Sequence, residues 1–444
     1  MFKRLLLSLY RRVFIISQWM RLHFTRTGHL CLILLVMSGV FGVNTKLSNT
    51  YQLFVFLLVL FVIALLASVI NRFKASITRQ LPRYATVGEP LNYVVSLNNE
   101  TKKAYTDLVY IENLHAVFPR YDEVINFHHK SHLPWYQQGV SFRVWRRYFY
   151  WQKGSYVEEY PIALIEVKNA TQLKVSCTPL RRGVLNFSGA YIAKPDVLGL
   201  FRRLYFAPAA QRCLVLPKRY TVKPFDLSGK RQYQSGGVSL ANSVGDSAEF
   251  MSLRDYRQGD ALNQIHWKSF ARHGKLIVKE YQDEYFVRRA LLLDTDGAEL
   301  APEYFEAAVS VAASLAMTDT QNDALLDLMF VGRESYHFTA GRGVDHLPHL
   351  QEILAAVQTS DSESFSRLKI AVMEHLERCS SLVCVLLHWD TLRQDFFKLL
   401  SQQGMPLAIF LIHDGTVIKA ELKNLPEHFY LINHQQLGND LAHL

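Results

Sequence analysis

Cysteine is scarce in this sequence, and the common signatures of catalysis are absent. The five cysteines are odd in number and show no C-x-x-C spacing, which argues against a disulfide framework or a zinc site and for buried thiols in a reducing compartment. The sequence also lacks G-x-S-x-G, H-E-x-x-H and P-loop patterns, so the enzyme classes that these patterns mark are not indicated. We therefore predict a protein that is not an enzyme.

Charged residues are missing from two apolar stretches near the N-terminus. Thr27–Thr45 and Leu47–Asn71 contain no Lys, Arg, Asp or Glu. Within the second stretch, Tyr51–Ile70 is a 20-residue apolar run, which as a helix would measure about 30 Å, the thickness of a bilayer core. Only Asn44–Thr50 separates the apolar cores Leu30–Val43 and Tyr51–Ile70, so we predict a transmembrane helical hairpin over residues 27–71.

Basic residues flank this hairpin and predict its orientation. They precede the first span and follow the second, whereas the connecting loop carries only Lys46. By the positive-inside rule, both termini and the domains that follow are cytoplasmic. Residues 1–26 combine an apolar helical face with arginines around it, which predicts a basic amphipathic helix at the cytoplasmic membrane surface. The flanking basic residues are Lys3, Arg4, Arg11, Arg12, Arg21 and Arg26, then Arg72, Lys74, Arg79 and Arg83.

The formal net charge of +10 does not indicate nucleic-acid binding. A basic segment beside a hydrophobic span is more simply a membrane anchor and topology signal. Residues 84–444 lack a localised basic stripe, so we expect no nucleic-acid partner.

Residues 84–222 have the pattern of an all-β domain. Short β-like runs, separated by Gly, Pro and Asn, predict a β-sandwich-like domain. Histidines cluster here without an acidic or cysteine partner at ligand spacing, which favours a polar loop over a metal site; they are His128, His129 and His132. The β-like runs include Leu91–Leu97, Ser141–Val144, Tyr160–Val167 and Gly183–Phe187.

Residues 285–444 alternate short apolar strands with helices. This alternation predicts a doubly wound α/β sheet with mostly parallel strands. Ligands of such sheets bind at the carboxyl ends of the strands, and Asp294 and Asp390 each follow a predicted strand. The predicted strands include Arg289–Asp294, Leu325–Val331, Ser381–Trp389 and Met405–His413, and the helices Pro302–Thr318 and Thr391–Gln402.

Between these domains, residues 223–284 form a connector with a dense mixture of charges. Its segment Gly245–Glu284 holds seven acidic and six basic side chains among apolar residues. Gly259-Asp260 predicts a tight turn, and Gln264–Lys275 a short helix that ends at His273-Gly274. Two interpretations remain open. The segment is a polar connector in which Arg254, Asp255 and Asp260 fix a turn, or it binds a partner or ligand.

This segment closely resembles the signature of the bacterial domain-of-unknown-function family 58. The matching positions are Glu249-Phe250, Leu253-Arg254-Asp255-Tyr256, Gly259-Asp260, Ile265, Trp267-Lys268, Ala271-Arg272 and Val278-Lys279-Glu280. Arg181-Arg182-Gly183 and Asp196–Phe201 resemble the family as well. The resemblance implies a membrane hairpin, a β-rich domain and a von Willebrand factor A-like domain in the bacterial inner membrane. It further implies partnership with a MoxR-type AAA+ ATPase in the assembly or maturation of a client protein. We expect partner binding at Arg254, Asp255, Tyr256, Gly259, Asp260, His266, Trp267, Lys268 and Arg272.

The same resemblance directs attention to a metal motif. A metal-binding von Willebrand factor A domain carries D-x-S-x-S after its first strand, and those oxygens suit Mg²⁺. This chain reads Asp294-Thr295-Asp296-Gly297-Ala298, so two of the three motif positions are changed. Candidate ligands are Asp294, Asp296, Thr339 and Asp390. The alternative is a strand-end aspartate that caps the following turn or helix, and we favour a vestigial site.

These observations support two hypotheses of different kinds. The first is a membrane-anchored, cytoplasm-facing scaffold or adaptor that works with the ATPase. The alternative is a membrane-associated hydrolase or transferase that uses His266 with Asp260, or His388 with Asp390, as acid and base groups.

Overall fold

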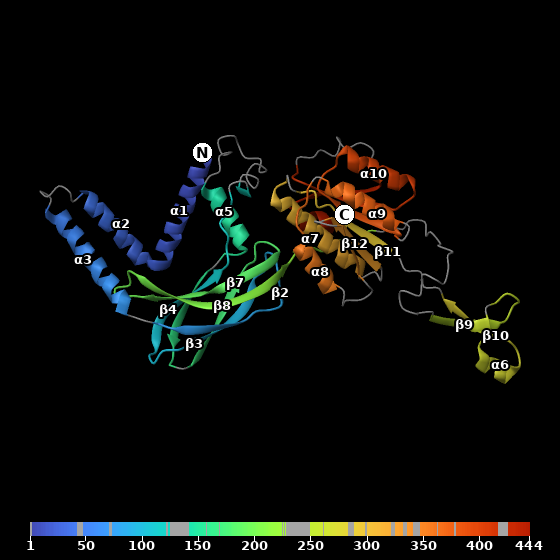
Figure 1. The fold of residues 1–444 in the computed structure, drawn as a ribbon, viewed down its shortest axis with the longest axis horizontal. Helices are drawn as coiled ribbons and strands as arrows, with labels where there is room; N and C mark the ends of the chain where they lie inside the picture. Colours follow the sequence, from blue (N-terminus) through green and yellow to red (C-terminus); the bar gives the residue numbers. More distant parts are fainter. Residues whose placement is uncertain are drawn as a thin grey trace.

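The computed structural model of this chain comprises N-terminal helices, a β-rich domain and an α/β domain from which a small arm extends (Figure 1). The structure describes residues 2–41, 48–70, 73–120, 123–124, 142–156, 158–167, 169–223, 225, 227, 249–260, 262–282, 288–297, 300–320, 325–331, 335–340, 347–361, 363–376, 379–415 and 425–444. The predicted polar loop with His128, His129 and His132 lies outside these residues, as does Ala298.

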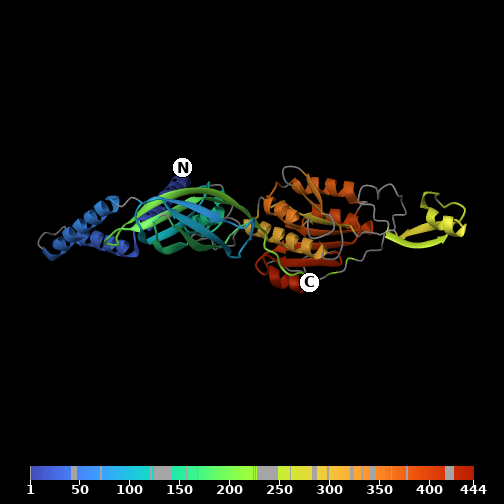
Figure 2. The same ribbon diagram turned by 90° about the horizontal axis from the view of Figure 1, so that it is seen from below.

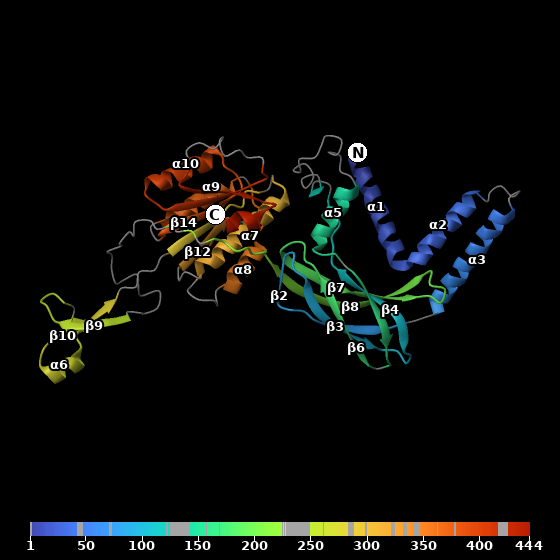
Figure 3. The same cartoon turned by 180° about the vertical axis from the view of Figure 1, so that it is seen from behind.

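The N-terminal helices are α1 (Phe2–His23), α2 (Arg26–Phe41) and α3 (Ser48–Ile70). In the part of the chain that the structure describes, one helix, Asn49–Ser68 within α3, is long and apolar enough to cross a membrane, and α2 is apolar but shorter. The two helices run side by side (Figures 1 and 3), and Gly39 of α2 lies against the ring of Phe54 of α3. Both leave large apolar side chains exposed, including Leu34, Phe56 and Leu66.

Helix α1 is the predicted amphipathic segment, and part of its apolar face is covered by protein. Phe14 is buried against Trp145 and Phe149 of helix α5 (Phe142–Lys153). Leu9, Ile16 and Trp19 remain exposed. The strand predicted at Ser141–Val144 is therefore wrong: Phe142 begins a helix, because the aromatic residues that follow it recur at helical rather than alternating spacing.

A tight turn of the β-rich domain holds the junction between α1 and α2. The Asp196 carboxylate accepts the backbone N–H groups of Leu200, at 2.7 Å, and Phe201, at 3.2 Å. The Thr25 N–H then donates to the Leu200 carbonyl at 3.1 Å. A Cβ atom at Gly28 would lie 2.1 Å from that carbonyl oxygen, so only glycine permits this approach. The turn Asp196–Phe201 thus joins the N-terminal helices to the β-rich domain.

Two sheets share the core of the β-rich domain. The first has strand order β1-β3-β6 and the second β2-β8-β7-β4-β5. Buried side chains of both sheets, such as Val95 of β3 and Leu108 of β4, pack in one cluster. The domain begins before the predicted residue 84, because β1 pairs with β3. The strands are β1 (Ala75–Gln80), β2 (Tyr84–Thr86), β3 (Leu91–Asn99), β4 (Tyr105–Leu114), β5 (Glu159–Ile165), β6 (Ala170–Cys177), β7 (Gly183–Pro195) and β8 (Arg202–Leu216).

The α/β domain is built on a sheet of strand order β13-β12-β11-β14-β15-β16, in which β13 is antiparallel to its neighbour and the other pairs are parallel. Alternate residues of β11 face opposite sides: Leu291 and Leu293 pack with α7, α8 and α11, whereas Ala290 and Leu292 pack with α9 and α10. Helices therefore cover both faces (Figure 2). The elements are β11 (Arg288–Leu293), α7 (Pro302–Thr320), β12 (Leu325–Val331), β13 (Ser335–Ala340), α8 (Leu347–Ala356), α9 (Ser364–His375), β14 (Ser381–Leu386), α10 (Thr391–Gln402), β15 (Leu407–His413), β16 (His428–Asn433) and α11 (Leu437–Ala442).

The predicted signature connector contains a folded hairpin, which we call the signature arm (residues 249–282). Strand β9 (Glu249–Asp255) pairs antiparallel with β10 (Ile277–Gln282), and between them lie a short 3₁₀ turn η3 (Leu262–Gln264) and helix α6 (Trp267–His273). Gly274, at φ +68°, is the left-handed C-cap of α6, as the sequence predicts. The arm lies beyond the end of the α/β domain in all three views (Figures 1 to 3).

Arg182, in the motif before β7, connects the β-rich domain to the α/β domain. Its guanidinium donates to the Leu354 and Val357 carbonyls at 3.1 and 2.6 Å, and pairs with Glu306 at 2.6 Å. It also lies over the Phe305 ring. The carbonyls at the end of α8 have no partner within their helix, so Arg182 caps that helix end while it joins the two domains.

Candidate functional site

The parallel pairing of β11 with β14 brings two aspartates to one edge of the sheet. Leu293, the last residue of β11, pairs with Val385 of β14. Asp294 follows β11 directly, and Asp390 follows β14 as the N-cap of α10. The sequence predicts this juxtaposition, because the carboxyl ends of parallel strands lie at the same edge.

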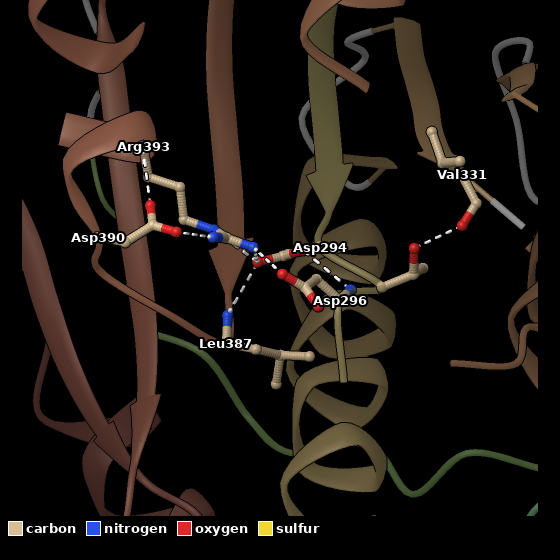
Figure 4. Close-up of polar contacts among 7 residues, drawn as sticks. Asp294, Asp296, Val331, Leu387, Asp390 and Arg393 are labelled. Atoms are coloured by element: carbon tan, nitrogen blue, oxygen red, sulfur yellow. Dashed lines mark hydrogen bonds and ion pairs between the residues drawn. The ribbon is translucent and has the colours of Figure 1, made fainter. Parts of the chain in front are cut away.

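Between these aspartates lies the guanidinium of Arg393, from the first turn of α10 (Figure 4). Its Nε and Nη2 atoms contact Asp294 Oδ2 at 3.0 and 2.9 Å. Nη2 also lies 3.0 Å from Asp296 Oδ2, and Nη1 lies 2.7 Å from Asp390 Oδ2. The Arg393 side chain is only 2% exposed. We call these four residues the arginine–aspartate cluster.

Two aspartates of the cluster, Asp294 and Asp390, are also fixed by backbone groups. Asp294 accepts the N–H groups of Asp296, at 3.0 Å, and Leu387, at 3.4 Å. Asp390 accepts the N–H of Arg393 at 2.9 Å and so caps α10. The capping alternative from the sequence thus applies to both residues, since Asp294 organises its turn and Asp390 its helix.

Burial dominates the electrostatics of the cluster. Burial raises the pKa of the fully buried Asp294 above its ordinary value, while the Arg393 charge and the two backbone donors oppose that rise. For Arg393, burial alone would lower the pKa, but Asp294, Asp296 and Asp390 raise it above its usual range. The guanidinium also lies 4.4 Å from the centre of the Phe365 ring, which favours the cation.

The residues present do not fit Mg²⁺. A magnesium ion requires oxygen ligands at about 2.0–2.1 Å in an octahedral arrangement, whereas Asp294, Asp296 and Asp390 all turn toward the Arg393 nitrogens. Within the described ranges, no group of three or more His, Cys, Asp or Glu residues could hold a metal ion.

Thr339 does not join the cluster. It pairs with Asp327 across β13 and β12, and Asp327 pairs in turn with Ala290. This register places Thr339 two strands away from β11 and level with Ala290, which lies four residues before Asp294. As a predicted metal ligand, Thr339 is therefore in the wrong position.

Sequence reasoning did not identify Arg393. One signal was available, because Arg393, Phe396, Phe397 and Leu400 recur at helical spacing and share the buried face of α10. A basic residue on a buried helix face requires a countercharge, and the aspartates at the strand ends supply it.

The signature arm is organised by a second arginine–aspartate pair. Arg254 donates to both carboxylate oxygens of Asp260, at 2.7 and 2.8 Å, and the Arg257 N–H donates to the same carboxylate at 2.7 Å. These hydrogen bonds lower the pKa of Asp260 to about 2. Gly259 precedes it at φ +113°, a conformation that favours glycine. Arg254, Gly259 and Asp260 therefore close the turn. Asp255 lies in strand β9, paired with Ile277.

Other signature residues lie on the outside of the arm. Trp267 is 60% exposed, and Phe270 of the same helix lies edge-on to it. Lys268 and Arg272 are exposed beside them, and Leu262 of η3 is 67% exposed. Ile265 and Val278 are buried and form the small interior of the arm.

The acid–base pairs of the alternative hypothesis have other partners. The His266 ring lies 2.6 Å from the Ser269 hydroxyl in the first turn of α6, while Asp260 binds Arg254 and Asp390 binds Arg393. Tyr256 is half-buried and its N–H donates to the Leu276 carbonyl.

Comparison with known proteins matches residues 252–426 to the family described as "Protein of unknown function DUF58". Residues 252–426 of this chain are thus similar to the DUF58 family. A relative, "Uncharacterized protein YeaD" of Bacillus subtilis (strain 168), is 26% identical over 202 residues. The match covers 45% of this chain and 49% of YeaD, so it spans about half of the length of that relative.

Solved structures that match parts of this chain do so at low identity and low TM-score. The CARDB domain of the PF1109 protein of Pyrococcus furiosus is 10% identical, with 32% of this chain and 89% of that chain covered and a TM-score of 0.18. A cohesin module of a Clostridium perfringens ATCC13124 glycoside hydrolase is 11% identical, with 32% and 98% covered and a TM-score of 0.17. At TM-scores this low, the similarity supports no conclusion about the fold or the function of this chain.

Replacing Arg393 with methionine should lower the free energy of unfolding by about 3–5 kcal/mol at pH 7, because the buried Asp294 carboxylate loses its countercharge. Loss of that charge also raises the pKa of Asp294 further, so the folded variant binds a proton that the unfolded chain does not hold. Its deficit relative to the wild type should therefore shrink as the pH falls from 7 to 5. Urea unfolding of the full chain in detergent micelles at both pH values measures this.

The matched control for this experiment is Arg367→Met, which removes an arginine paired with the exposed Asp361. That variant should lose less than about 1 kcal/mol. A deficit for Arg393→Met that equals the control, or that does not change with pH, contradicts the role of Arg393 as the countercharge of Asp294.

Added Mg²⁺ or Mn²⁺ at millimolar concentration should leave the melting temperature of the wild type unchanged, because Arg393 already binds the carboxylates. Arg393→Ala should instead become metal-responsive, since Asp294, Asp296 and Asp390 then face one another without a cation. A site filled at a hundredfold excess over its dissociation constant would add about 2.7 kcal/mol. Thermal unfolding tests both proteins, and a wild-type shift that Asp294→Ala abolishes would show that a metal displaces the guanidinium.

Proposed function

We propose that this protein is a membrane-anchored, cytoplasm-facing scaffold or adaptor that docks a protein partner through its signature arm. The observation that carries the proposal is that different residues of the arm hold its turn together and form its exposed surface. Arg254 and Asp260 bind each other and hold the turn, while Trp267 and Phe270 stay exposed on α6. Protein interfaces are commonly anchored by an exposed tryptophan on an element whose own conformation is fixed, as the Arg254–Asp260 pair fixes this arm.

The anchor that we propose is a two-span hairpin of α2 and α3. The exposed apolar side chains of both helices support it, as do the basic residues before α2 and after α3. With those basic residues in the cytoplasm, both termini and the β-rich and α/β domains lie on the cytoplasmic side of a bacterial inner membrane.

We further assign the α/β domain to the von Willebrand factor A-like type. The mostly parallel sheet with helices on both faces supports this assignment, as does an aspartate directly after β11. In metal-binding members of that type a partner's acidic group completes the metal shell. Here the Arg393 guanidinium satisfies Asp294 internally, so we place partner docking on the signature arm instead.

The partner class that we propose is a MoxR-type AAA+ ATPase, which acts with this protein on a client complex during its assembly or maturation. The family resemblance supports this choice. The arm presents Lys268 and Arg272 beside its exposed aromatic residues, so the complementary surface is apolar at its centre and acidic at its rim.

Trp267→Ala should reduce recovery of the ATPase at least about tenfold when the tagged full chain is isolated from membranes, because a buried interface tryptophan contributes about 2 kcal/mol or more. The matched control is Tyr336→Ala, which removes an exposed aromatic residue from β13 and should not affect recovery. Equal recovery with Trp267→Ala, or no ATPase with the wild type under any nucleotide condition, contradicts the proposal.

A phosphatase reporter fused after Leu444 should be inactive and a cytosolic reporter at the same position active, because the proposed hairpin returns the chain to the cytoplasm. The two reporters measured in parallel in intact cells give the orientation. An exported C-terminus would disprove the two-span hairpin.

A further inference from the structure

A polar hollow lies in the β-rich domain, where the end of α5 meets the start of β7. Its volume is about 240 Å³, below the range of about 300–1,000 Å³ that is usual for drug-sized ligands. It therefore suits a small ligand or a head group. Its lining includes His115, Gln152, Lys153, Arg181, Arg182 and Asn186.

Cations dominate this hollow, and two of them form no ion pair with a described residue. Arg182 is neutralised by Glu306 at 2.6 Å. Across the residues that the structure describes, no carboxylate forms an ion pair with Lys153 or Arg181. Arg181 instead lies over the Trp151 ring, with 5.2 Å between its guanidinium carbon and the ring centre.

Burial destabilises the charge of both cations, although Glu112 partly offsets this effect for Lys153 and Glu306 partly offsets it for Arg181. Burial lowers the pKa of Lys153 to about 8, with the nearby charge of Arg21 acting in the same direction. Burial lowers the pKa of Arg181 as well. A desolvated cation is destabilised until an anion or hydrogen-bond acceptor approaches it, so the hollow is electrostatically prepared for an anion.

Gln152 narrows the chemical class of that anion. Its Oε1 atom is buried and has no hydrogen-bond partner among the described residues. As an amide oxygen, this atom can only accept a hydrogen bond. A hydrogen phosphate group offers oxygens to Lys153 and Arg181 and an O–H to Gln152. A carboxylate or sulfate ion would satisfy the cations alone.

We propose that this hollow binds a phosphate group, held by Lys153 and Arg181 as charged donors and by Gln152 as acceptor. The phosphate is a monoester, so that it keeps an O–H for Gln152, and it comes from a small phosphorylated molecule or from the head group of phosphatidic acid. The neighbouring Arg182 contacts the α/β domain, so the site lies directly beside the contact between the two domains.

Calorimetric titration of the full chain with inorganic phosphate tests this proposal, with the chain embedded in phosphatidylcholine nanodiscs and chloride at equal ionic strength as reference. The wild type should bind phosphate saturably, with about one phosphate per chain. Lys153→Met and Arg181→Gln should each weaken binding about tenfold or more, since each removes a charge-assisted hydrogen bond. Lys153→Arg should restore most of the affinity because it keeps the charge.

The control is Lys174→Met, which removes an exposed lysine from β6 of the same domain and should bind phosphate as the wild type does. Nanodiscs that contain phosphatidic acid identify the source of the phosphate. Loss of the phosphate response there indicates a lipid head group, and its persistence indicates a soluble ligand. A wild type without saturable, phosphate-specific binding, or an equal loss in Lys174→Met, overturns the proposal.

Discussion

The end of the α/β sheet depends on one constraint, which is that a guanidinium and a carboxylate are buried together. Asp294 is fully buried and Arg393 nearly so, and neither would tolerate burial without the other, because an unpaired charge in the protein interior costs several kcal/mol. Their pairing determines the path of the chain after β11 and the position of α10 over the sheet. Asp296 and Asp390 complete the arrangement from the two flanking loops. The Arg393 guanidinium thus neutralises the carboxylates at the ends of β11 and β14. In metal-binding von Willebrand factor A-like domains, the type that we propose here, a metal ion takes that position.

The elements that hold this site could be predicted from local sequence, whereas its central residue could not. Apolar runs followed by aspartates place Asp294 and Asp390 at strand ends, and His273-Gly274 marks the end of α6. Arg393 was missed because the burial of an arginine depends on partners about a hundred residues away in the chain. Thr339 was misplaced because it was expected in a loop that supplies the threonine ligand of the family, whereas it lies in strand β13. The run at Ser141–Val144 was too short to distinguish alternation from the helical spacing of Trp145 and Phe149.

The signature segment shows why charge patterns alone left two interpretations open. A dense mixture of acidic and basic residues is compatible with internal pairing and with partner binding. In the structure the two roles fall to different residues. Arg254 and Asp260 satisfy each other, and the exposed surface consists of aromatic and basic residues of α6. The residues that resemble the family signature therefore include both the internal Arg254–Asp260 pair and the exposed residues of α6. Mutation of the internal pair should affect the stability of the arm, whereas mutation of the exposed residues should affect partner binding.

The contact made by Arg182 also has a mechanical consequence. The Asp196 turn joins the N-terminal helices to the β-rich domain. Arg182 joins that domain to the α/β domain, together with the ion pairs Arg83–Glu352 and Arg147–Glu303. A force applied at the arm would be carried toward the N-terminal helices through these polar contacts. The packed cores of the two domains take no part in them, so such a force would load the contacts between the domains first.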